Sequence, residues 1–295
     1  MALHHLAPNG GSNDRSVSRP VLLIHGATFP TACAAGWRID GLSWMDDLAG
    51  AGCDTYGLDF IGFGASASAP GDPGVGGSET ASPDGADDLS RQIELAVRHI
   101  QARHDGARVH VVAHSAGTFA AGRCAVRLPA QVASLTLFGA PVAGEPVAGL
   151  ETPGPAWRLL TIAEQFEAFE ARVRGSGQLD RAMFESWGRA YLAADPLAAT
   201  RDPPAVRVPA AMMAEVRRVL RLGQRPYDPA RIAARTLVIQ GAWDEVAPPE
   251  RGLRLFGQLG CADKRYVVLG RAGHRAHLER ERGRLFEEVR EFLAG

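Results

Sequence analysis

The stretch Val111-Val112-Ala113-His114-Ser115-Ala116-Gly117-Thr118 joins two segments of different pattern. Residues 108–112, at its start, form a short β-branched run that is typical of a buried strand. Residues 118–128 (TFAAGRCAVRL), at its end, are small and compatible with a helix, and Pro129 follows them. The sequence therefore predicts a strand that runs directly into a helix, with Ser115 at the bend.

A bend of this kind holds its central residue in a strained backbone conformation, so the residues two positions away are kept small. Ala113 and Gly117 occupy these positions. The Ser115 hydroxyl then projects above the edge of the sheet, where the first N–H groups of the helix also point. The motif resembles the G-x-S-x-G nucleophile elbow of the α/β-hydrolase superfamily, with Ala113 in place of the first glycine. The alternative is a buried serine in an ordinary strand–loop–helix crossover.

Strand patterns alternate with helix patterns along most of the chain, which predicts an α/β fold. Further strands are expected at residues 20–24, 53–59, 134–138, 236–240 and 265–269. Helices are expected at residues 44–52 with Ser43 as N-cap, 86–103, 249–260 and 275–293. Strands separated by helices form a mostly parallel sheet with helices on both faces, as the α/β-hydrolase resemblance also implies.

Reactive groups in such sheets collect at the carboxyl ends of the strands. Here the strand ends carry His25-Gly26-Ala27, Ser115, Asp244 and His274. The order Ser, Asp, His along the chain is the order of the α/β-hydrolase triad. A serine hydroxyl is a weak nucleophile and needs an adjacent base. We therefore expect His274 to accept the proton of Ser115, and Asp244 to orient the imidazole.

A tetrahedral oxyanion needs hydrogen-bond donors that are fixed in advance. The N–H of Ala116, directly after the serine, is the first candidate. The N–H of Ala27 is the second, and Thr28 is the alternative to Ala27.

Several of these residues could instead have a structural role without taking part in catalysis. Asp244 could be a surface acid, in which case Glu145 is the alternative triad acid, because some relatives place their acid after the preceding strand. His277 lies one turn beyond His274 and is expected to cap or pack. Asp59 is expected to be a structural hydrogen-bonding residue rather than the acid.

The resemblance covers residues 20–141 and 226–295, which we assign to the core domain. Residues 1–19 are expected to form an N-terminal arm with room for one edge strand. The strand–helix alternation stops at residues 142–225, where helices are predicted at 161–174, 179–194 and 210–222. This segment is interpreted as an inserted helical lid. Residues 67–85 are expected to form an irregular loop. The candidate substrate-binding residues are His25, His114, Phe166 and Trp187.

Composition excludes several classes of function. The formal net charge of −1 indicates no electrostatic surface for nucleic acid or an anionic membrane. The four cysteines are scattered and have neither metal-ligand nor disulfide-framework spacing. No cofactor, metal or arginine-clamp motif is present. The N-terminus lacks the pattern of a secretory signal and no apolar run is long enough to span a membrane, so we expect a cytoplasmic protein whose partner is a small-molecule substrate.

A nucleophilic serine with two oxyanion donors is suited to acyl transfer. The sequence predicts a cofactor-free serine hydrolase that cleaves a carboxylic ester or lactone of a small, hydrophobic substrate through an acyl-enzyme on Ser115. Amidase, thioesterase and carbon–carbon bond hydrolase activities use the same triad and stay open. A small-molecule receptor on an α/β-hydrolase fold is the alternative of another class.

Overall fold

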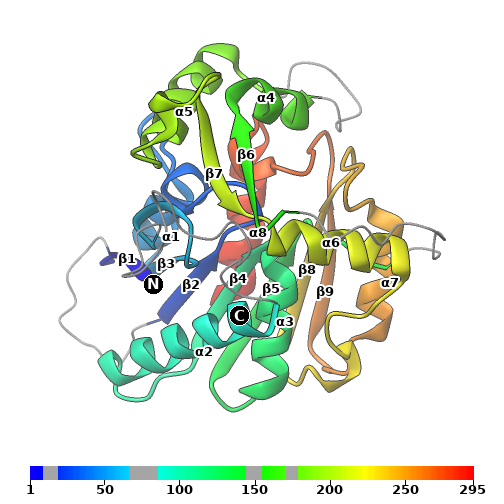
Figure 1. The fold of residues 1–295 in the computed structure, drawn as a ribbon. Coiled ribbons are helices and arrows are strands. Elements are labelled where there is room, and N and C mark those ends of the chain that lie inside the picture. Colours follow the sequence, from blue (N-terminus) through cyan, green and yellow to red (C-terminus); the bar gives the residue numbers. More distant parts are fainter. Residues whose placement is uncertain (9–18, 67–85, 144–154, 171–178) are drawn as a thin grey trace.

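The computed structural model describes residues 1–8, 19–66, 86–143, 155–170 and 179–295. Its seven-stranded sheet has the order β1-β3-β2-β4-β5-β8-β9 (Figure 1). All neighbouring strands pair in parallel except β1, which pairs antiparallel with β3 at one edge. The predicted mostly parallel sheet is therefore confirmed. The strands are β1 (Ala2–Leu6), β2 (Arg19–Ile24), β3 (Cys53–Asp59), β4 (Val109–His114), β5 (Val132–Phe138), β8 (Arg235–Gly241) and β9 (Lys264–Leu269).

Helices cover both faces of this sheet, because alternate residues of each strand point to opposite faces. In β2, Val21 and Leu23 face a cluster that contains the apolar residues of α1 and α8. Leu22 and Ile24 face the other cluster, which contains the apolar residues of α2 and α3. In Figure 1, α3 lies in front of the sheet and α8 behind it. The helices are α1 (Trp44–Gly50), α2 (Ala86–Arg103), α3 (Gly117–Arg127), α7 (Pro249–Gln258) and α8 (Arg282–Ala294).

Helix α1 begins where the sequence predicts. Ser43 Oγ accepts the N–H of Asp46, and the Asp46 carboxylate accepts the N–H of Ser43. This reciprocal capping box satisfies two of the N–H groups that the first turn leaves unpaired. Gly52, two residues after the helix, has φ of 81°, a conformation that glycine adopts without strain.

The sequence predicts that helices dominate residues 142–225, but the described part of this segment also contains two strands that were not predicted. Besides α4 (Ile162–Glu170), α5 (Arg181–Ala193) and α6 (Ala211–Leu222), the segment contains β6 (Trp157–Thr161) and β7 (Ala205–Pro209). These two strands form a separate antiparallel sheet, which lies with α4 and α5 at the top of Figure 1. Each strand has only five residues, and its partner lies far away in the sequence, so local periodicity gave no signal.

The helix expected at residues 275–293 also differs from the structure, because α8 begins only at Arg282. Residues Ala276–Leu278 form a single 3-10 turn instead. The Glu279 carboxylate accepts the N–H groups of Gly273 and Arg275 and so holds this segment as a compact loop. The helix can start only after the chain leaves this loop.

Candidate active site

Ser115 lies directly after β4, and its φ of 51° is in the left-handed region that non-glycine residues rarely adopt. The predicted strain at the elbow is thus confirmed. Gly117 begins α3, and a Cβ there would lie 2.4 Å from the carbonyl oxygen of His25. A glycine at this position therefore lets the loop after β2 approach the elbow closely.

Three side chains from separate strand ends form one chain of hydrogen bonds. The Oγ of Ser115 is 2.8 Å from Nε2 of His274. The Nδ1 of the same imidazole is 2.8 Å from Oδ2 of Asp244. The exposed fractions of Ser115, His274 and Asp244 are 9%, 5% and 2%, so the chain is shielded from water. A carboxylate can only accept, so Nδ1 of His274 donates to Asp244, and in the neutral form of the ring Nε2 faces the Ser115 hydroxyl as an acceptor.

The backbone around Asp244 orients its carboxylate. The Oδ1 atom accepts the N–H groups of Val246 and Ala247, both at 2.8 Å, which leaves Oδ2 for His274. Gly241, the last residue of β8, allows the two loops to meet. A Cβ at Gly241 would lie 2.3 Å from the carbonyl oxygen of Ala272. The alternative acid, Glu145, lies outside the described residues.

Two side chains hold the backbone around His274: Glu279, which the sequence analysis did not assign, and His114, which it named as a candidate substrate-binding residue. Glu279, with an exposed fraction of 3%, accepts the N–H of Gly273 at 2.6 Å and that of Arg275 at 3.2 Å. Burial raises the pKa of Glu279. His114 Nε2 donates to the carbonyl oxygen of His274 at 2.8 Å. Glu279 could not be found from sequence, because it stands in a run of charged residues with no signal of burial.

His25 has a structural role rather than a free face toward a ligand. Its Nδ1 donates to the carbonyl oxygen of Gly26 at 2.6 Å, and its Nε2 accepts the N–H of Phe60 at 3.3 Å. Burial lowers the pKa of His25, which keeps the ring neutral as these bonds require. The imidazole therefore ties the loop after β2 to the loop after β3.

The same loop places candidate oxyanion donors beside Ser115. A Cβ at Gly26 would lie 3.3 Å from Cβ of Ser115, which shows how closely the loop approaches the elbow. Within the described part of the chain, the N–H groups of Ala27 and Ala116 donate to no carbonyl or side-chain acceptor. Unpaired N–H groups are expected at the start of a helix such as α3.

Two further buried histidines lie behind His274. The ring of His114 is 5.1 Å from that of His274 and 4.6 Å from that of His277, measured between centroids. Burial, with the charge of Arg275 as a smaller cause, lowers the pKa of His277 to about 3. Burial likewise lowers the pKa of His114 well below its usual value. His277 packs, as expected, and neither of its ring nitrogens forms a hydrogen bond within the described part of the chain.

The two candidate aromatic residues of residues 142–225 differ in their surroundings. Trp187 is 1% exposed, stacks on Tyr191, and donates its indole N–H to the carbonyl oxygen of Cys33. The hydrogen bond from Trp187 therefore holds α5 against the core. Phe166 is half-buried between α4 and α5, where the Arg181 guanidinium lies 5.3 Å from its ring centroid.

Within the described ranges, no three histidine, cysteine or acidic side chains are grouped to hold a metal ion. Among the described helices, none has both the length and the apolar character to cross a membrane.

Comparison with known families matches residues 17–281 to the family described as serine aminopeptidase, S33. The chain belongs to this family. It is an α/β-hydrolase and a hydrolytic enzyme, as the elbow motif predicts.

Solved structures show the same fold across almost the whole hydrolase chain. A monoacylglycerol lipase from Paleococcus ferrophilus is 20% identical, with a TM-score of 0.59 and coverage of 99% of this chain and 98% of that one. The 2-hydroxy-6-oxo-6-phenylhexa-2,4-dienoate hydrolase from Rhodococcus sp. strain RHA1 is 21% identical, with a TM-score of 0.63 and coverage of 100% and 99%. A serine hydrolase involved in carbazole degradation is 20% identical, with a TM-score of 0.64 and coverage of 99% and 93%. No protein of curated function gives a significant sequence match.

Proposed function

We propose that this α/β-hydrolase is a serine hydrolase that cleaves a carboxylic ester or lactone through an acyl-enzyme on Ser115. The observation that carries the proposal is the buried chain of hydrogen bonds from Ser115 through His274 to Asp244, with both distances at 2.8 Å. These distances are within the range in which a base can take the proton of a nucleophile.

In the proposed reaction, Ser115 Oγ attacks the carbonyl carbon while Nε2 of His274 takes the hydroxyl proton. The imidazolium then donates this proton to the leaving alkoxide, and the carbon–oxygen bond to the alcohol breaks. Water repeats the sequence on the acyl-enzyme, releases the acid and restores Ser115. Asp244 stays ionised throughout and stabilises the imidazolium that forms in each half.

The N–H groups of Ala116 and Ala27 are proposed as the oxyanion donors. Their support is that both lie next to Ser115 in the fold and that neither has an acceptor among the described residues. Donors that are fixed before the reaction need no reorganisation when charge develops on the oxygen.

Residues 142–225 are proposed to act as a lid over a core formed by residues 20–141 and 226–295, with residues 1–19 as an arm that carries β1. The proposed substrate is small and hydrophobic, and the proposed location is the cytoplasm. Trp187 is packed into the aromatic cluster, so we expect its truncation to reduce stability rather than to alter substrate preference.

Labelling with a fluorophosphonate probe tests the nucleophile directly. We expect one adduct, on Ser115, and none in a Ser115→Ala variant that folds normally. The same variant should lose activity by several orders of magnitude. A native protein without an adduct would favour the receptor alternative, and an active Ser115→Ala variant would overturn the mechanism.

A substrate panel tests the type of bond. Matched ester, lactone, amide and diketone substrates with the same acyl part should show the highest kcat/KM for the ester or lactone. A preference for the diketone would instead assign carbon–carbon bond hydrolysis to the same three side chains.

A further inference from the structure

Helix α4 (Ile162–Glu170) has one buried face, and two loops of the proposed core contact it. On this face Gln165 and Phe169 are only 2% and 5% exposed, whereas the glutamates of the same helix are exposed. Residues three and four positions apart share one side of a helix, so Gln165, Ala168 and Phe169 form a single surface. Each of the two loops that meet this surface carries part of the proposed catalytic machinery.

The first contact connects α4 to the loop after β2. The side-chain amide of Gln165 donates to the carbonyl oxygen of Thr28 at 3.4 Å and to the hydroxyl of Tyr191 on α5 at 3.1 Å. Because a primary amide has two N–H donors, both bonds can form at once. Thr28 directly follows Ala27, whose N–H is proposed as an oxyanion donor. The position of this donor therefore depends on a helix of the proposed lid.

The second contact connects α4 to the loop after β9. The Arg275 guanidinium donates to the carbonyl oxygen of Ala168, and its Cζ lies 4.4 Å from the ring centroid of Phe169. Ala168 is in the last turn of α4, where carbonyl groups lack a donor within the helix and the helix dipole favours a cation. Arg275 directly follows His274, the proposed base, and is only 9% exposed. The backbone position of His274 therefore depends on the same helix face.

The two contacts lie close together along α4. Gln165 and Ala168 differ by three positions, which corresponds to a rise of about 4.5 Å along the helix. A displacement of α4 therefore breaks both contacts together. The consequence for catalysis is large, because a shift of about 1 Å in a catalytic group can lower the rate by about a hundredfold.

We propose that α4 positions the oxyanion donor and the general base together, because Gln165 holds the loop of Ala27 and Arg275 holds the loop of His274 when the helix is packed against the core. Gln165 and Arg275 are positioning residues, since they act through Thr28 and through the backbone of His274. The site is complete only when the helix is in place, as in enzymes that close over their substrate. This inference rests on the proposed ester hydrolysis.

The first test removes the contact made by Gln165. Gln165→Met keeps an unbranched side chain of similar size without the donor, so it should lower kcat for a p-nitrophenyl ester about tenfold with KM nearly unchanged. Tyr191→Phe removes the other acceptor of the same amide and leaves the bond to Thr28. It should lower the melting temperature and leave kcat within about twofold of the unmodified enzyme. If both variants lower kcat equally, or if neither does, Gln165 has only a structural role.

The second test concerns the contact made by Arg275. Arg275→Gln removes the charge and shortens the side chain, so kcat should again fall about tenfold with KM nearly unchanged. Arg275→Lys keeps a cation near the end of the helix and should recover part of the rate. A rate in Arg275→Lys no higher than in Arg275→Gln would show that the cation does not hold the loop.

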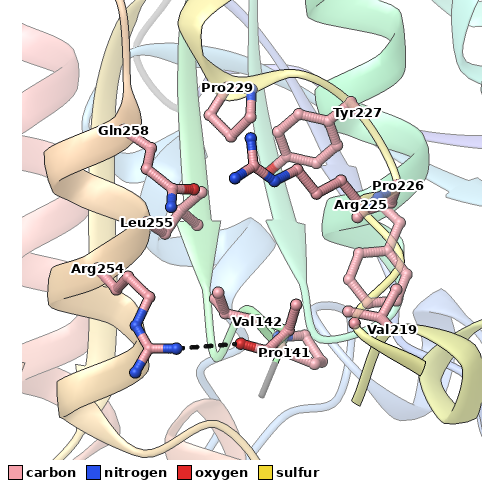
Figure 2. Close-up of a pocket in the computed structure, with 13 residues that line it drawn as sticks. Pro141, Val142, Val219, Arg225, Pro226, Tyr227, Pro229, Arg254, Leu255 and Gln258 are labelled. Atoms are coloured by element: carbon pink, nitrogen blue, oxygen red, sulfur yellow. Dashed lines mark hydrogen bonds between the residues drawn. The ribbon is translucent and has the colours of Figure 1, made fainter. Parts of the chain in front are cut away.

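An arginine elsewhere in the fold provides the matched control. Arg254 of α7 also donates to a backbone carbonyl, that of Ala143 at 3.5 Å. It lies in a pocket between α3, α6 and α7 whose described lining includes none of the proposed catalytic residues (Figure 2). Arg254→Gln should therefore leave kcat unchanged. An equal loss in this variant would show that the effect of Arg275→Gln is not specific to α4.

The double variant Gln165→Met/Arg275→Gln tests whether one helix acts on both loops. Loss of either contact should already displace α4, so the second substitution should add little. We expect the double variant to lose about ten- to thirtyfold in kcat rather than the roughly hundredfold product of the two single losses. Losses that multiply would show two independent contacts and would overturn the proposal.

Hydrogen exchange separates failure of this inference from failure of the proposed function, because it needs no substrate. In Gln165→Met, the amides of residues 270–275 should exchange about fivefold faster or more, although the contact removed belongs to the loop after β2. Residues 26–31 should respond in the same way to Arg275→Gln. If each substitution changes exchange only in the loop that it contacts, the inference is wrong, whether or not the enzyme hydrolyses esters.

Discussion

Substitution of His277 tests how the burial of an imidazole affects the free energy of unfolding, separately from any effect on catalysis. Its ring lies among those of Phe29, Trp44 and Phe138, at centroid distances of 6.3, 6.2 and 5.8 Å. Neither ring nitrogen has a hydrogen-bond partner among the described residues. Burial of such a group without a partner costs about 1–3 kcal/mol. We therefore expect His277→Leu, a change of similar volume, to be neutral or stabilising at pH 7.

The stability of His277→Leu relative to the unmodified protein should increase as the pH falls. The native ring stays neutral until its pKa of about 3, whereas the unfolded ring takes a proton near its usual pKa of 6.5. Stability is therefore lost as the pH falls from the upper value toward the lower one, because the unfolded state binds more protons. At pH 5 the gap of about 1.5 pH units corresponds to roughly 2 kcal/mol.

Urea unfolding at pH 7 and pH 5 measures this difference. On going to pH 5, the unmodified protein should lose about 2 kcal/mol more of its free energy of unfolding than His277→Leu. His99→Leu, at an exposed site on α2, is the matched control. Activity at pH 7 should persist in His277→Leu and disappear in His274→Leu. If both leucine variants at 277 and 99 show the pH dependence of the parent, the reasoning from burial is wrong.

Three further substitutions test the parts that hold the site together. Asp244→Asn should lower kcat by about 10⁴-fold with little change in KM, because the imidazole loses the partner that fixes its tautomer; a mild effect would favour Glu145 as the acid. Glu279→Gln should lower kcat about tenfold or more at unchanged KM, because the amide can accept only one of the two N–H groups beside His274, whereas the exposed Glu287→Gln should have no effect. Gly241→Ala should destabilise the fold by about 1–3 kcal/mol in thermal unfolding, because its Cβ would meet the carbonyl oxygen of Ala272.

The sequence pattern was sufficient to predict the helices and strands that are stabilised by residues close to one another in the sequence. The N-cap at Ser43, the strand at Cys53–Asp59 and the helix at Ala86–Arg103 lie at the predicted residues. Each depends on neighbours within a few positions, through capping or through the alternation of buried and exposed side chains. The predicted start of α8 was wrong because the buried carboxylate of Glu279 holds the preceding residues in a loop. The residues next to Glu279 in the sequence give no sign that its side chain is buried.

The sequence by itself determined the class of fold and the order in which Ser115, Asp244 and His274 occur. The strand periodicity and the small residues at the elbow involve only residues that are close together in the sequence, so they can be recognised without the structure. Only the tertiary structure decided that their side chains meet at 2.8 Å, and that β6 pairs with β7. Contacts between distant segments depend on how the sheet and helices pack, and no local pattern encodes the distance between two such side chains.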